Sequence, residues 1–326
     1  MSSHATYLTA EHFQFQQIVD GVYAAIAIPG HGAASNAGII DIGGQTLVFD
    51  TGLTPQAGAA LYAAATELTG SPVTTVINSH YHRDHMGGNQ AFPEAVNFIA
   101  TSRTRCLITE QSAQKLEWLR QHGQSQLTEL EAALDKAQRR AEQEDLQNAI
   151  GQQQHLLAAL PTLVVRAPTM TFDQRLVLYG RNRVAELITY GGGHTQSDAI
   201  LYLPAEGIIF MGDLLTVKHH PALSDGDPGE LPRILDLITR LEPQQLIPGH
   251  GPVGRVEDLQ LMQQYLGIAT EIALTELTFQ TESDEAVEKR IASLKAPSPF
   301  GSWQRSSIYA SNLRFLYQRA MTAYAE

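Results

Sequence analysis

The sequence predicts an α/β (α+β) fold in which two related, β-rich halves pack face to face. In the first half, the apolar run over residues 46–49 leads directly to Asp50. In the second half, the run over residues 207–211 is followed closely by Asp213. Two strands that are each followed by an aspartate indicate a weak internal repeat. If each half forms a sheet that buries one face, the two sheets are expected to pack together.

The composition is that of an ordinary globular protein of 326 residues, with 43% hydrophobic and 17% charged residues. Such a chain buries a large core without disulfide bonds, and Cys106 is its only cysteine. The formal net charge of -12, with no Lys/Arg-rich run, argues against nucleic acid as a partner, because an acidic protein repels the phosphate backbone.

Apolar periodicity and turn residues predict the elements around the two aspartates. In the first half we expect strands at residues 22–28, 38–42, 46–49 and 73–77, with a helix at 55–68. In the second half we expect strands at residues 175–179, 184–190, 198–203 and 207–211. The first half therefore runs strand, helix, strand, and ends in a polar loop.

Two regions have helical spacing instead. Residues 104–160, rich in Gln, Glu, Ala and Leu, predict a helical insertion of two or three antiparallel helices within a single domain over 1–326. Residues 256–326 predict a C-terminal helical extension that covers a sheet. We interpret the insertion as a packed flap, and a lid over a site or a dimer contact are the alternatives.

A dense group of metal-ligand residue types follows the strand at 73–77. His80, His82, Asp84 and His85 lie within six consecutive positions. Residues two apart in an extended chain point the same way, so His80 and His82 can converge on one ion. The turn beyond them can direct Asp84 and His85 to a second ion.

Three later residues complete the set. His194 follows three glycines that let the backbone approach a site closely, Asp213 at a strand end can bridge two ions, and His250 lies in a tight turn. Imidazole nitrogens and carboxylate oxygens without thiolate suit zinc, with manganese, iron or cobalt as alternatives. The sequence therefore predicts two Zn²⁺ ions.

This pattern resembles the metallo-β-lactamase fold superfamily. Its HxHxDH signature matches residues 80–85, and its later Gly-His, strand-terminal Asp and His match His194, Asp213 and His250. The resemblance runs from about residue 22 to residue 251 and leaves out both helical regions. It implies a four-layer αββα sandwich with the metals along one edge between the sheets.

The metal pair implies a hydrolytic mechanism, in which metal-bound hydroxide attacks a small-molecule carbonyl. One ion would bind His80, His82 and His194, the other Asp84, His85 and His250, with Asp213 shared. The catalytic candidates are Asp213, as the shared ligand, and Asp84, which can also orient the nucleophile or pass a proton to the leaving group. Asp50 is expected to hold a ligand histidine or backbone amides rather than the metal.

Departures from individual branches of the superfamily narrow the substrate. Asp213 stands where many antibiotic-cleaving members carry cysteine, so the resemblance favours the esterase, thioesterase and lactonase branches. His82 stands where the di-iron electron-transfer branch uses glutamate, which argues against redox chemistry. Hydrolysis of an ester, lactone, thioester or β-lactam is the leading hypothesis. A metal-dependent phosphodiesterase or nuclease, and a non-catalytic metal protein whose insertion binds a partner, are the alternatives.

Candidate substrate-binding residues lie near the predicted ligands in sequence. Lys218 is a candidate anchor for a carboxylate, and His219, His220 and His31 are candidates to border the pocket. Tyr190, like Tyr81, is a candidate oxyanion donor, with simple packing as the alternative role. A homodimer is left open.

The sequence has no basic leader followed by an apolar stretch, and no apolar run of membrane-spanning length. We therefore expect a cytoplasmic protein without a membrane anchor.

Overall fold

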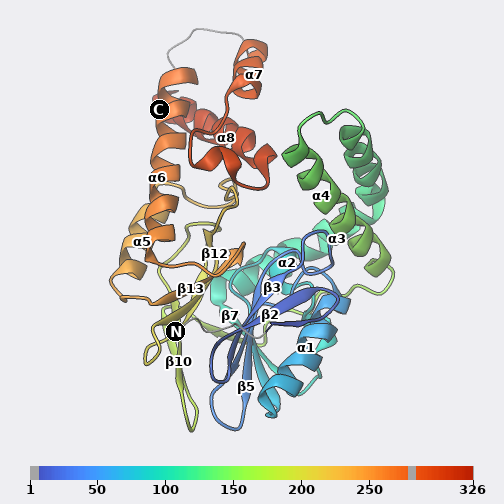
Figure 1. The fold of residues 1–326 in the computed structure, drawn as a ribbon, viewed down its shortest axis with the longest axis vertical. Helices are drawn as coiled ribbons and strands as arrows, with labels where there is room; N and C mark the ends of the chain where they lie inside the picture. The colour runs from blue at the N-terminus through green and yellow to red at the C-terminus, as the bar shows by residue number, and fades with distance from the viewer. Residues whose placement is uncertain (1–6, 278–283, 326) are drawn as a thin grey trace.

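Two β-sheets pack face to face with helices on both outer sides in the computed structural model, which describes residues 7–277 and 284–325 (Figure 1). The predicted four-layer αββα sandwich is therefore confirmed. The helices described in these ranges include none that is long and apolar enough to cross a membrane.

The first sheet contains eight strands that lie side by side in chain order. They are β1 (Tyr7–Thr9), β2 (Phe13–Val19), β3 (Val22–Ala27), β4 (Ala37–Asp41), β5 (Thr46–Phe49), β6 (Val73–Ile77), β7 (Asn97–Thr101) and β8 (Met170–Phe172). Neighbours from β1 to β5 are antiparallel, and those from β5 to β8 are parallel. The parallel part places the ends of β5 and β6 at one edge of the sandwich.

The second sheet has the order β13-β12-β11-β10-β9. Its strands are β9 (Arg175–Tyr179), β10 (Val184–Thr189), β11 (Ala199–Leu203), β12 (Ile208–Thr216) and β13 (Gln245–His250). Only the pair of β12 and β13 is parallel. The ends of these two strands point to the edge that β5 and β6 also reach, and the site lies there.

The core between the sheets consists of apolar side chains from alternate strand positions. Phe49 of the first sheet lies against Phe210 of the second, with 5.9 Å between ring centroids. Gly38 lies opposite Phe210, and a Cβ at this position would collide with the ring. The close approach of the two sheets therefore requires glycine at this point.

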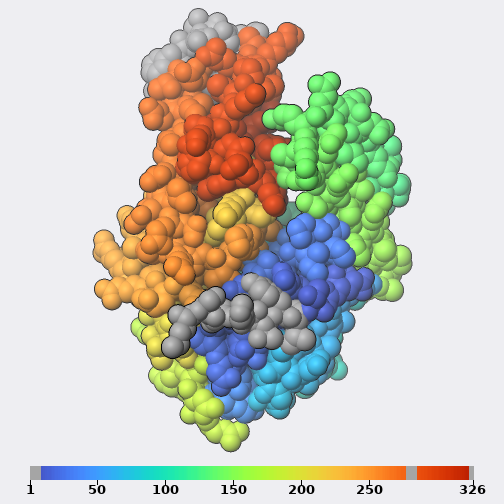
Figure 2. All heavy atoms as spheres, in the orientation of Figure 1, coloured from blue at the N-terminus to red at the C-terminus, as the bar shows by residue number. Residues whose placement is uncertain are grey.

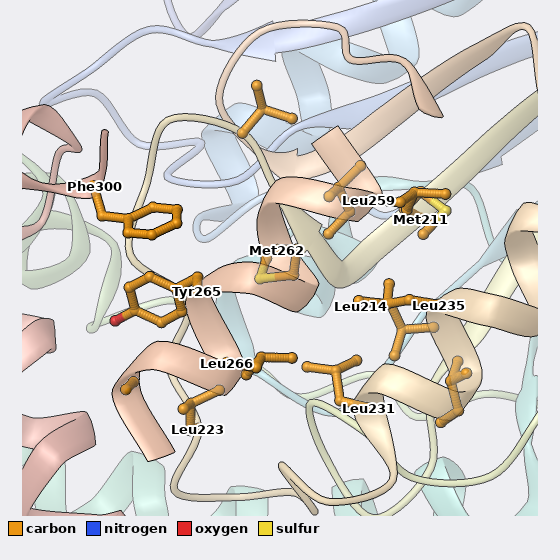
Figure 3. Close-up of a cluster of buried hydrophobic side chains, with 14 of the residues drawn as sticks. Met211, Leu214, Leu223, Leu231, Leu235, Leu259, Met262, Tyr265, Leu266 and Phe300 are labelled. Atoms are coloured by element: carbon orange, nitrogen blue, oxygen red, sulfur yellow. The ribbon is translucent and has the colours of Figure 1, made fainter. Parts of the chain in front are cut away.

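Helices cover the two outer faces. α1 (Pro55–Thr69) begins after Thr54, whose side chain accepts a hydrogen bond from Ala57 N, and its apolar face covers the first sheet. α5 (Leu231–Thr239) and α6 (Val256–Ile272) cover the second sheet. Figure 3 shows Met211 and Leu214 of β12 packed against the side chains of α5 and α6.

The predicted helical insertion consists of two long helices, α3 (Ser102–Leu134) and α4 (Arg140–Ala159). They pack side by side as a hairpin, and Gln153 Nε2 donates to Gly123 O at 2.8 Å. The C-terminal region continues after α6 with η2 (Ala273–Leu277), α7 (Asp284–Ser293), η3 (Phe300–Ser302) and α8 (Ser306–Ala325). Residues 278–283 and 326 of the predicted extension lie outside the described residues.

Two local expectations are wrong. Asp213 does not end its strand, because β12 continues to Thr216 through a register shift around Gly212. His250 does not lie in a turn but is the last residue of β13. In both cases the pairing of β12 with β13 extends strand geometry past the glycines, which the sequence suggested as strand ends.

Candidate metal centre

The segment between β6 and α2 (Arg83–Met86) carries the dense ligand cluster at the end of the first sheet. His82 is the N-cap residue of α2, with an extended backbone, so the chain turns sharply between His82 and Asp84. Across the gap between the sheets, His194 lies in the loop between β10 and β11. Asp213 and His250 extend from the paired strands β12 and β13.

The structure brings all seven predicted ligands together in two neighbouring groups. The ligand atoms within each group lie within 4.8 Å of one another. One group contains His80, His82, His194 and Asp213, and the other contains Asp84, His85 and His250. The two sets of three residues expected for the two ions fall into separate groups, and Asp213, which was expected to be shared, is grouped with the first set.

Asp213 lies between the two groups. Its Oδ2 is 3.4 Å from His194 Nε2 and 3.3 Å from His250 Nε2, while its Oδ1 is 3.2 Å from His85 Nε2. Asp84 Oδ2 lies 3.4 Å from His250 Nε2. A carboxylate that faces imidazoles of both groups has the position of a ligand shared between two cations.

Glycines create the space that Asp213 occupies. A Cβ at Gly249 would collide with the Asp213 carboxylate, and one at Gly212 would lie 2.7 Å from the Cβ of Ser79. Gly212 also has a left-handed backbone, with a φ of 51°. The irregularity of β12 at Gly212 therefore turns Asp213 toward the histidines.

Asp50, at the end of β5, orients the loop of the first sheet. Its carboxylate accepts hydrogen bonds from Ser79 N at 2.7 Å and Ser79 Oγ at 2.7 Å, and it lies 2.8 Å from His85 Nδ1. Asp50 is fully buried, and its φ is 60°. It contacts a ligand histidine and a backbone amide, the two kinds of partner that the sequence suggested.

The other four histidines are also held through the ring nitrogen that faces away from the two groups. The partners are Ser79 Oγ for His80 Nδ1 at 2.9 Å, Asp225 Oδ2 for His82 Nε2 at 2.8 Å, Ala222 O for His194 Nδ1 at 3.0 Å and Ala34 O for His250 Nδ1 at 3.1 Å. Such partners fix the ring orientation and leave the other nitrogen free to coordinate.

The inward-facing atoms fit metal ions. Within residues 7–277 and 284–325, His80 Nε2, His85 Nε2 and Asp213 Oδ1 are buried and make no well-aligned hydrogen bond, although the last two face each other at 3.2 Å. Leaving buried polar atoms unpaired is costly, and coordination would remove that cost. Nitrogen and oxygen donors in this arrangement are the ligands that zinc prefers.

Electrostatics favour the charge states that metal ligands need at Asp213 and His80, whereas at His85 a cation would have to displace a proton. Burial raises the pKa of Asp213, but the imidazoles of His250 and His85 outweigh it and hold that pKa well below its usual range. Burial lowers the pKa of His80 far below its usual value, so its ring is neutral. Burial alone would lower the pKa of His85 too, but the carboxylates of Asp213 and Asp84 raise that pKa well above its usual value.

Sequence reasoning missed several supporting residues. Asp225 accepts hydrogen bonds from His82 and from Tyr81, which brings its own pKa well below the usual range. Asp198 accepts the backbone N–H groups of Gly193, His194 and Thr195. A carboxylate directly after a glycine-rich loop is a local signal for Asp198, but no spacing motif marks Asp225.

The metal centre opens into a groove with a volume of about 1280 Å³. Asp84 and His250 lie in its floor, and its two walls are the insertion and the C-terminal helices α7 and α8. Figure 2 shows these walls facing each other, the insertion in green and the C-terminal helices in red. They meet where Asp145 of α4 accepts hydrogen bonds from Arg305 N at 3.0 Å and Ser306 N at 2.9 Å, at the start of α8.

The candidate substrate-binding residues are distributed unevenly. His219 and His220 line the groove, and burial lowers the pKa of each to about 4. Lys218 is exposed and does not line the groove. Arg305, which no sequence argument selected, does line it.

The two tyrosines and His31 have other neighbours. Tyr81 donates to Asp225, and Tyr190 packs against the core beneath α5. His31 lies against His12 and His155, with ring centroids 6.2 Å and 5.6 Å away. In this arrangement none of the three lines the groove.

Comparisons with known proteins agree with this geometry. The model of the metallo-beta-lactamase superfamily matches residues 31–105. Metallo-beta-lactamase type 2 of Bacteroides fragilis is 23% identical over 271 residues, which cover 79% of this chain and 88% of that protein.

Solved structures with the same fold include two metallo-beta-lactamases. The enzyme from Pontibacter korlensis is 18% identical, with a TM-score of 0.54 over 81% of this chain and 99% of its own. FIM-1 from Pseudomonas aeruginosa, in a mono-zinc form, is 18% identical, with a TM-score of 0.56 over 79% of this chain and 96% of its own.

Proposed function

We propose that the chain, which is similar to the metallo-β-lactamase superfamily in sequence and fold, is a dinuclear zinc hydrolase of small-molecule carbonyl compounds. The position of Asp213 between the two ligand groups is the observation that carries the dinuclear part of the proposal. His80, His82 and His194 would hold one ion, and Asp84, His85 and His250 the other. When bound, the ions supply Lewis acidity and lower the pKa of water toward neutrality.

The side chains that meet the substrate are the least buried of the ligands. The side chain of Asp84 is 25% exposed and that of His82 is 21% exposed, whereas His85 is fully buried. Asp84 lies in the floor of the groove, so it can orient a water molecule or pass a proton to the leaving group. His85 and Asp50 do not line the groove: His85 would hold an ion, and Asp50 orients His85 from behind.

The groove supports a substrate larger than a simple ester. Its volume exceeds the ~300–1,000 Å³ of ordinary small-molecule sites, at about 1280 Å³. Its lining combines apolar helix faces with cationic side chains (Arg139, Lys295 and Arg305) and with the carboxylates of Glu142 and Asp145. We propose an ester, lactone, thioester or β-lactam that carries an apolar body, with a negatively charged group near Arg305.

Metal analysis combined with a substrate panel tests this function. Protein purified without chelator is analysed for metal, and aryl ester, lactone, thioester, β-lactam and aryl phosphodiester substrates are assayed. We expect turnover of one carbonyl class, which is lost with metal in His82→Ala and kept in His122→Ala, a histidine change on the exposed surface of α3. Phosphodiester turnover alone would replace the proposal with a phosphodiesterase, and inactive, metal-free protein would reject both.

A further inference from the structure

A second group of histidines lies outside the metal centre, at the junction between the insertion and the first sheet. His12 precedes β2, His31 lies in the loop between β3 and β4, and His155 lies on α4. Their potential ligand atoms lie within 4.8 Å of one another. Three imidazoles from three separate segments therefore meet at one point.

The geometry of these rings is close to that of a three-histidine site. The ring centroids are 5.3 Å apart for His12 and His155, 5.6 Å for His31 and His155, and 6.2 Å for His12 and His31, with interplanar angles of 88°, 25° and 66°. In the metal centre, the corresponding separations among His80, His82 and His194 are 4.7 to 4.9 Å. The three rings would have to move inward, and His31 would have to turn relative to His155, to reach the arrangement of the metal centre.

The surroundings of the three rings indicate a ligand. His12 is 2% exposed, and His31 Nδ1 is buried with no hydrogen-bond partner in the described part of the chain. The Gly32 amide donates to His12 Nδ1 at 3.3 Å, a long hydrogen bond that coordination at this nitrogen would replace. Burial and the neighbouring imidazoles lower the pKa of His12, and the Glu11 carboxylate partly opposes them.

We propose that His12, His31 and His155 bind a third divalent metal ion, with zinc as the best match for three neutral imidazoles. This site is structural in its effect. It joins α4 of the insertion to the loop between β3 and β4, where the two backbones already touch: a Cβ at Gly151 would collide with Gly30 O.

The same loop supports the metal centre. Ala34 O accepts the hydrogen bond of His250, Ser35 Oγ donates to Asp84 O, and Asn36 Nδ2 donates to Pro248 O at 2.9 Å. A metal at the three-histidine site therefore fixes one wall of the groove relative to the backbone that holds two of the ligands. The inference does not depend on the substrate or on hydrolysis.

Zinc binding by the full chain tests the site directly. Chelator-stripped protein is reloaded with Zn²⁺, desalted and analysed for metal. We expect His155→Ala, and equally His155→Gln, to hold about one zinc ion per chain fewer than the wild-type protein, with hydrolysis still detectable. His122→Ala, which removes a histidine of α3 outside the group, keeps the wild-type content.

Limited proteolysis gives a second readout. The turn between α3 and α4 contains Lys136, and α4 begins with Arg140 close to it, so trypsin can report on the attachment of the insertion. We expect Zn²⁺ to slow cleavage there in His80→Ala, whose metal centre is damaged, and not in His80→Ala combined with His155→Ala. Equal zinc content in wild type and both His155 variants, or equal protection in the two proteolysis variants, would overturn the proposal.

Discussion

The metal centre and the groove above it are built in different ways. Each ligand histidine in the centre is held by a bond from its own ring nitrogen to a nearby strand end or loop, as His85 is by Asp50. The groove walls come from segments more than a hundred residues apart, and the carboxylate of Asp145 joins them at the start of α8. The comparison indicates that a bonded partner behind each ligand histidine fixes the chemistry, whereas the packing of two helical walls determines which substrate enters.

Removal of the shared carboxylate should have the largest effect. In Asp213→Ala we expect hydrolysis to fall by about 10³-fold or more, because the two ligand groups lose the anion that faces both of them. Steady-state kinetics and metal analysis check this, with exposed Asp173→Ala as the control. Near-normal turnover with full metal content would show that the two groups act independently.

Weaker effects are expected where the bonds behind the ligands are changed. Asp50→Asn should lower zinc affinity by about 100-fold and Asp225→Asn by about 10-fold, since Asp50 is buried and holds both Ser79 and His85. Competition with a chelating dye measures both affinities. If the two variants bind zinc as tightly as the wild type, these carboxylates do not orient the ligands.

The dependence of stability on pH should report on His220, which lines the groove and is not a proposed metal ligand. Burial lowers the pKa of His220 to about 4, so the unfolded chain takes up a proton first as the pH falls below about 6.5. The folded protein therefore loses stability as the pH falls from the unfolded-state pKa toward the folded-state pKa of His220. Between pH ~7.5 and pH ~5 the free energy of unfolding should fall by about 2 kcal/mol.

Urea unfolding in the presence of chelator measures this loss. The side chain in His220→Gln does not titrate, so over the same pH range this variant should lose about 2 kcal/mol less stability than the wild-type protein. His220 Nδ1 lies 3.2 Å from the Tyr265 hydroxyl, and a protonated ring could not accept that bond. Identical pH profiles for the two proteins would mean that His220 is protonated in the folded state as readily as in the unfolded chain.

The smallest effect should come from separating the groove walls. Asp145→Ala removes the acceptor for two N–H groups at the start of α8, which should cost about 1 kcal/mol of stability. We also expect KM to change several-fold while kcat and metal content stay nearly constant. Thermal unfolding and kinetics check this against Glu129→Ala on the exposed face of α3. A large loss of kcat would show that the wall takes part in the chemistry.

The sequence predicted the features that depend on neighbouring residues. The strands at 46–49 and 73–77 have the expected bounds, and the ligand spacing at residues 80–85 follows from one loop. The continuation of strand β12 beyond Asp213 was harder to predict, because it depends on pairing with β13, which is distant in the sequence. Asp225 and Asp145 could not have been found, since each acts on a partner that folding brings from a distant part of the chain.

Several functional expectations stay predictions. They include the identity of the substrate, the native metal, the cytoplasmic location and a homodimer. Lys218, in the loop after β12, is exposed, whereas Arg305, far from any ligand in the sequence, lines the groove. A residue's distance from a ligand in the sequence is thus a poor guide to the pocket wall.

The insertion begins after β7 and the chain returns in β8, and these two strands are neighbours in the first sheet. Both ends of the helical hairpin are therefore anchored side by side, whatever its length. During evolution this hairpin could become longer or shorter, or be replaced, without altering the register of any strand that carries a metal ligand. The same property makes it the natural place to graft new specificity onto an unchanged hydrolytic centre.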